Sequence, residues 1–130
     1  MPIEFICLAT LALLLLLAFL PASFAKGKTY GLKWAASNRD RVPNKELPAW
    51  ASRCERAHNN LKDNFPSFAV TIFLLAFLGK FSDATAVCAQ VYLGARLVHF
   101  LSYGLGFAPL RTLAYMTGLF INIYLILQVF

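Results

Sequence analysis

Long apolar stretches alternate with short polar segments along the chain, and this pattern predicts four membrane-spanning helices. The first stretch, residues 3–25, is almost wholly apolar. The last two are also apolar, apart from Gln90, Arg96 and His99 in the third and Arg111 in the fourth. We expect the helices at about residues 3–25, 50–79, 84–103 and 109–129.

The second helix differs from the others because its apolar part is too short to cross a bilayer. Residues 65–78 form about 14 residues of helix, or about 21 Å, whereas a bilayer core needs about 20 residues. The polar residues before this run, among them Arg56, Asn60 and Asp63, must therefore complete the span. Ionisable side chains are costly at that depth, so their presence indicates a functional site.

The composition also indicates an integral membrane protein. Hydrophobic residues make up 59% of the 130 residues and charged residues only 14%, against about 45–50% and about 25% in soluble proteins. The one long polar segment, the loop at residues 26–49, is too short to form a core of its own. We therefore expect a single all-α membrane domain over residues 1–130, built as a four-transmembrane-helix bundle.

The distribution of Lys and Arg predicts the orientation of this bundle. The connection between the second and third helices has a single basic residue, Lys80. The basic residues of the first loop are Lys26, Lys28, Lys33, Arg39, Arg41 and Lys45. By the positive-inside rule the first loop faces the cytoplasm, so four spans place both termini on the non-cytoplasmic side of a bacterial inner membrane or an endomembrane. The net charge of +6 suits a loop beside anionic lipid headgroups, and no nucleic-acid-binding motif accompanies it.

A cleavable signal peptide is the alternative interpretation of the first helix. Residues 23–25 resemble a small-residue cleavage site. However, a signal peptide begins with a basic segment, and the only charged side chain before this apolar run is Glu4. We therefore expect an uncleaved helix.

The three cysteines, Cys7, Cys54 and Cys88, have no paired spacing. They predict neither a disulfide framework nor a metal site, and we expect free thiols. Cys54 lies nearest the polar residues of the second helix, but a packing role is more common for such a residue than a nucleophilic one.

Polar side chains of the last three helices fall on single helical faces, because a helix turns by about 100° per residue. These residues are Arg53, Arg56, Asn60 and Asp63 on the second helix, Tyr92, Arg96, His99 and Tyr103 on the third, and Arg111 and Tyr115 on the fourth. The expected topology places all three groups at the cytoplasmic end. Each charged side chain could simply extend to the membrane interface or pair with another charge. Convergence from three helices favours a shared site instead.

These residues carry a resemblance to a known family. The segment Arg56-Ala-His-Asn-Asn60-Leu-Lys-Asp63-Asn-Phe-Pro66 is similar to the R-A-x-x-N-x-x-E-x-x-P signature of the MAPEG family, the membrane-associated proteins of eicosanoid and glutathione metabolism. Residues 92–103 resemble the family's third helix, and residues 109–115 the start of its fourth. The resemblance runs from about Arg53 to the C-terminus.

The resemblance implies a homotrimer that binds glutathione between subunits near the cytoplasmic face. The implied glutathione contacts are Arg56, Asn60, Asp63, Arg96, His99, Tyr103 and Tyr115. Arg111 is implied to be catalytic and to face the sulfur. Such residues offer arginines for the carboxylates of glutathione, an acid for its ammonium group, and amide or phenol donors for its peptide groups.

The implied function is a glutathione-dependent transferase or peroxidase. A thiol with a pKa near 8.5 is mostly protonated at neutral pH, and lowering this pKa by about two requires about 2.7 kcal/mol, which a desolvated arginine can supply. The thiolate would attack a lipophilic electrophile or reduce a lipid hydroperoxide that enters from the bilayer. Asp63 stands where the family has a glutamate, so its side chain reaches one methylene less far.

Two other classes of function stay open. The family includes a lipid-binding accessory protein without catalysis, so the chain could be a non-catalytic membrane scaffold. A small transporter is the third possibility, but it would place polar residues through both leaflets, whereas the outer half has only isolated groups such as Asn122 and Gln128.

Overall fold

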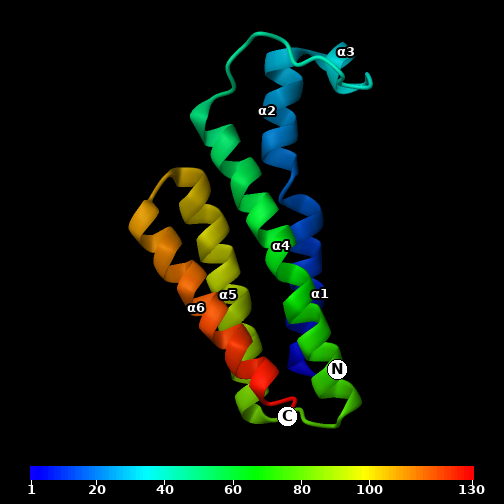
Figure 1. The fold of residues 1–130 in the computed structure, drawn as a ribbon, viewed down its shortest axis with the longest axis vertical. Coiled ribbons are helices and arrows are strands. Elements are labelled where there is room, and N and C mark those ends of the chain that lie inside the picture. Colours follow the sequence, from blue (N-terminus) through cyan, green and yellow to red (C-terminus); the bar gives the residue numbers. More distant parts are fainter.

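The computed structural model describes all 130 residues and contains helices but no strands. The helices are α1 (Ile3–Leu17), α2 (Leu20–Tyr30), α3 (Leu32–Ala35), α4 (Ala49–Phe77), α5 (Asp83–Leu105) and α6 (Ala108–Leu127). Figure 1 shows α1, α4, α5 and α6 packed lengthwise, with α2 continuing α1 past the turn that joins α5 to α6. Both termini and the α4–α5 connection lie at one end of the bundle. The all-α prediction is confirmed.

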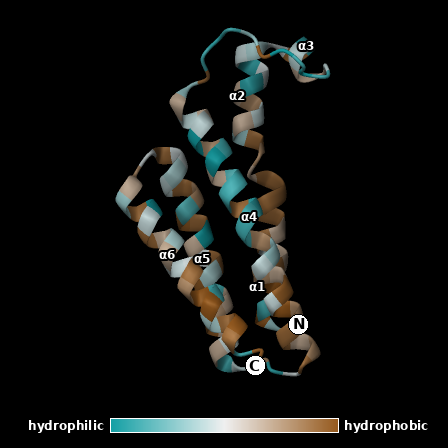
Figure 2. Ribbon diagram, in the orientation of Figure 1, coloured by the Kyte–Doolittle hydropathy of each residue, from teal (hydrophilic) through white to brown (hydrophobic).

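Three helical segments are long and apolar enough to cross a membrane: Ile3–Tyr30, Asp83–Leu105 and Ala108–Leu127. The helix α4 has 29 residues, about 43 Å at 1.5 Å per residue, but charged residues interrupt its first half. Figure 2 shows hydrophilic residues gathered in the half of α4 nearer the long loop, whereas α1 is mostly hydrophobic. By length and composition, these three segments agree with an integral membrane protein, and the fourth span stays a prediction.

The first apolar stretch forms two helices rather than the single helix expected over residues 3–25. Pro21 lies in the first turn of α2. Proline has no N–H to donate and its ring clashes with the carbonyl four residues earlier, so a straight helix cannot continue past Leu17. The second piece ends at Gly31, whose φ of 95° favours glycine. The loop expected at residues 26–49 therefore begins at Gly31 rather than at Lys26.

A buried polar contact ties the beginning of α1 to the beginning of α5. Ser82 and Thr85 form a capping box at the start of α5, which satisfies backbone N–H groups that have no partner inside the helix. The Thr85 hydroxyl also donates to the carboxylate of Glu4 at 2.5 Å. Because Glu4 is only 3% exposed, this hydrogen bond gives a buried carboxylate its partner.

The apolar core lies in the half of the bundle toward the termini and joins all four long helices. Its fully buried members include Leu11, Phe68, Ile72, Leu75, Tyr92 and Leu125. The rings of Phe68 and Tyr92 stack with centroids 4.1 Å apart. This core holds α4 against α5 and so fixes the position of the polar residues in the other half of the bundle.

Candidate functional site

Near the end of the bundle at the α5–α6 turn, residues of α4, α5 and α6 line an open cavity of about 300 Å³. Its lining residues are Asn60 from α4, His99 and Tyr103 from α5, and Arg111, Thr112 and Tyr115 from α6. All of these except Thr112 are among the candidate residues from the sequence. The three polar faces therefore meet at one depth of the bundle.

Aromatic rings contact the cations in and beside this cavity. The guanidinium carbon of Arg111 lies 4.8 Å from the centre of the Tyr103 ring, and that of Arg56 lies 5.8 Å from the same ring. The His99 ring packs edge-on against Tyr103 at 5.5 Å and lies 6.0 Å from Tyr115. Cation–π contacts hold a guanidinium without using its N–H donors, so Arg111 keeps donors for a ligand.

Arg96 lies in the wall behind the cavity rather than on its surface. The side chain is only 1% exposed and is not among the lining residues. Its Nη1 atom donates to the amide oxygen of Asn60 at 3.5 Å, and its Nη2 atom donates to that of Asn64 at 3.3 Å. Neighbouring side chains thus enclose its guanidinium in the protomer, and the expected contact between Arg96 and glutathione stays a prediction.

Arg56 and Asp63 lie on the exposed surface of α4 and do not line the cavity. At about 3.6 residues per turn, Asn64 is about 40° further round the helix than Asn60, toward the bundle, whereas Asp63 is about 60° in the opposite direction. Asp63 forms no ion pair in the protomer. The polar face of α4 is thus divided between the cavity and the surface of the chain.

Sequence reasoning did not single out Asn64, Thr112 or Gly118. Asn64 is one turn from Asn60, so the spacing of the stripe could have indicated it. Gly118 is different, because its role is to leave space: a Cβ there would lie 3.0 Å from Nη2 of Arg96. The only sequence signal for such a role is a glycine inside an apolar helix.

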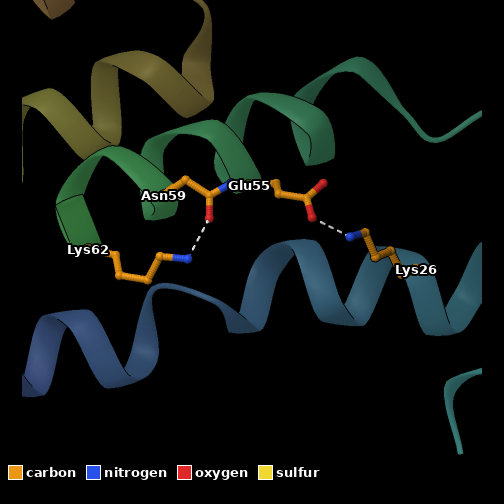
Figure 3. Close-up of polar contacts among 4 residues, drawn as sticks. All are labelled: Lys26, Glu55, Asn59 and Lys62. Atoms are coloured by element: carbon orange, nitrogen blue, oxygen red, sulfur yellow. Dashed lines mark hydrogen bonds and ion pairs between the residues drawn. The ribbon is translucent and has the colours of Figure 1, made fainter. Parts of the chain in front are cut away.

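A second polar surface of α4 faces α2. Lys26 of α2 forms an ion pair with Glu55, and Lys62 donates to Asn59 at 3.3 Å (Figure 3). Figure 3 shows these side chains between α4 and the first two helices. The ion pair joins α2 to α4, whereas the Lys62–Asn59 bond lies within α4, and none of the four residues lines the cavity.

The three cysteines are free, and none of them lines the cavity. No group of three His, Cys, Asp or Glu side chains is placed to hold a metal ion. The cavity surface offers guanidinium, imidazole, phenol, hydroxyl and amide groups. These groups can bind an anion and donate hydrogen bonds to it.

Comparison with known families covers almost the whole chain. The profile of the MAPEG family matches residues 3–130, a range that includes the first helix as well as the three helices that carry the motifs. A search of curated proteins found no matching sequence. The extent of the family match shows that the chain belongs to the MAPEG family.

Proposed function

We propose that this protein is a membrane-embedded, glutathione-dependent transferase or peroxidase that acts on lipophilic electrophiles or lipid hydroperoxides. The supporting observation is the position of Arg111 in the wall of a cavity that it shares with His99, Tyr103 and Tyr115. Family membership is compatible with this activity, since the family covers glutathione transferases and peroxidases as well as non-catalytic members.

The cavity residues fit glutathione in charge and in hydrogen-bonding capacity. Arg56, which contacts the same Tyr103 ring as Arg111, would bind a carboxylate, and Arg111 would face the sulfur. Asn60 and Tyr115 would serve the peptide groups. The volume of about 300 Å³ is at the lower end of the usual range for ligand pockets, about 300–1,000 Å³. The ammonium group needs an acid, and Asp63 lies outside this cavity.

A homotrimer would complete the site. Arg56 and Asp63 are exposed on the single protomer, and exposed ionisable groups are costly within a membrane. Packing of α4 against a neighbouring protomer would cover both side chains and bring an acid to a cavity shared between subunits. In this assembly α4 forms the fourth span, because its polar half faces protein instead of lipid.

The same arrangement suggests an orientation in the membrane. The cavity lies toward the basic loop that follows α3, so we place it at the cytoplasmic end with both termini on the opposite side. This orientation suits a bacterial inner membrane or an endomembrane. A lipophilic substrate would reach the cavity from the bilayer.

Arg111 is the proposed catalytic residue. Bound glutathione would supply a thiol for nucleophilic attack or for peroxide reduction. Arg111 would stabilise the thiolate form, and a pKa lowered by about two corresponds to about 2.7 kcal/mol. A guanidinium can supply this energy in a site from which water is largely excluded, because electrostatic interactions are stronger there than in water. Tyr115 would donate a hydrogen bond in the same cavity.

A non-catalytic lipid-binding scaffold is the second candidate. One observation favours it: none of the residues that line the cavity of the protomer is acidic, so glutathione's ammonium group has no partner there. In that case the polar residues would only hold the subunits together.

Titration of the detergent-purified protein with glutathione tests the proposal. Calorimetry would measure binding, and near-ultraviolet absorbance would measure the thiolate. The wild type and Arg41→Ala, a control at an exposed arginine in the loop, should both bind and give a thiolate signal. Arg111→Ala should bind but lose most of that signal. No binding by the wild type would refute the glutathione-dependent activity and favour the scaffold.

A further inference from the structure

Arg96 is a buried cation without a counterion. It is 1% exposed, and the protomer's single ion pair joins Lys26 to Glu55 instead. Its oxygen partners are two neutral amides, from Asn60 and Asn64, and its Nε atom has no hydrogen-bond partner. Burying a charge is costly unless other charges or hydrogen bonds compensate for it. This cost calls for an explanation beyond helix packing.

Three helices fix the position of the Arg96 guanidinium. Its central carbon lies 4.9 Å from the ring centre of Tyr92 and 5.6 Å from that of Tyr115. The amides come from α4, Tyr92 belongs to α5, and Tyr115 belongs to α6. On α6, the absence of a side chain at Gly118 leaves room for Nη2. Side chains of three helices therefore enclose the guanidinium in the wall of the cavity.

Two of these neighbours, Asn60 and Tyr115, also line the cavity. Arg96 holds them from behind, through a hydrogen bond in one case and a cation–π contact in the other. The cavity also contains Arg111 and is lined by no acidic side chain. Its surroundings are therefore positively charged, and such charges act strongly across a wall of low dielectric.

We propose that Arg96 is a positioning residue that adapts the cavity to an anionic ligand. It keeps Asn60 and Tyr115 in place at the cavity wall, and its own unbalanced charge favours an anion in the adjoining space. The inference rests on the proposed function in taking an anionic thiol, glutathione, as the ligand. It differs from direct recognition, because the guanidinium does not reach the cavity surface.

The ligand test compares glutathione with its diethyl ester, in which both carboxylates are neutralised. The wild type should prefer glutathione, and Arg96→Met should reduce this preference about tenfold. Arg96→Lys, which retains the charge, should keep most of the preference, and Arg41→Met is the surface control. If Arg96→Met weakens the binding of both ligands equally, or of neither, Arg96 does not select an anion and the proposal is overturned.

A second test needs no ligand. Arg96→Met, Tyr115→Leu and the double variant are compared by thermal unfolding in one detergent. Because the two side chains share a contact, the melting temperature of the double variant should fall by less than the sum of the decreases in the two single variants. Additive losses would overturn the positioning role. If Arg96→Met does not fold, Arg96→Lys replaces it in the comparison.

The two tests separate the two proposals. A wild type that binds no glutathione refutes the proposed function, and the thermal comparison then decides alone whether Arg96 positions Tyr115. A wild type that binds glutathione while Arg96→Met retains the full preference for it supports the proposed function and overturns the role of Arg96.

Discussion

Replacement of Gly118 by alanine should destabilise the bundle through Arg96. The added Cβ would lie 3.0 Å from Nη2 and 3.1 Å from both Cζ and Nε of Arg96. Carbon atoms pack best at about 3.5–4.0 Å, so the guanidinium must move by several tenths of an ångström. It cannot move freely, because its hydrogen bonds to Asn60 and Asn64 hold it on the other side.

Two opposing contributions set the size of this effect. Glycine within a helix costs about 0.5–1 kcal/mol relative to alanine, so the substitution gains that amount. Overpacking of a filled interior costs about 1–3 kcal/mol. The expected net loss is about 1 kcal/mol, or about 4 °C in melting temperature for a chain of this size. Gly94→Ala is the matched control, because nothing lies within 4 Å of the added Cβ.

Thermal unfolding of the two variants and the wild type, followed by circular dichroism in one detergent, measures this difference. A single scan rate is needed, because irreversible unfolding makes the melting temperature depend on it. Gly94→Ala should melt at or above the wild type and Gly118→Ala below it. If both variants melt together, the space beside Arg96 is not tight and the reasoning about its fixed position is wrong.

Two further predictions concern contacts away from the cavity. Thr85→Val removes the donor to the buried carboxylate of Glu4, together with the oxygen that accepts from the Ser82 N–H, and should lower the free energy of unfolding by about 1–3 kcal/mol. Its control in denaturant unfolding is Thr10→Val, at an exposed hydroxyl that bonds within its own helix. Equal losses of free energy in the two variants would show that the buried Thr85 hydroxyl stabilises the fold no more than an exposed one. Glu55→Gln breaks the partly exposed pair with Lys26 and should cost at most about 1 kcal/mol. This loss should shrink as salt is added, and a loss above about 2 kcal/mol at high salt would contradict the assignment as a surface pair.

Hydropathy indicates where most of the helices lie but not how the first one bends. The apolar stretches near residues 84–103 and 109–129 agree closely with α5 and α6, because each is long enough to require burial in lipid or protein. Hydropathy does not indicate the break between α1 and α2. It measures the polarity of Pro21, whereas the break results from the N–H that proline lacks.

Helical periodicity predicted which faces of the helices meet, but it could not show which side chains line the cavity. His99 and Tyr103 line it, whereas Arg96 on the same face is enclosed in the wall. That difference depends on Gly118 of α6, which leaves space for the guanidinium. Likewise, Asp63 lies on the surface because of the rotation of α4 against α5, which the spacing within α4 does not specify.

An experimental structure of the protein determined with glutathione tests the central claim most directly. We predict density for the tripeptide in the cavity, with its sulfur near Arg111 and its backbone in contact with Asn60 and Tyr115. Arg96 should remain in the wall without touching the ligand. Glutathione density elsewhere, or an assembly in which Arg111 faces lipid and the cavity holds no ligand, would contradict the account.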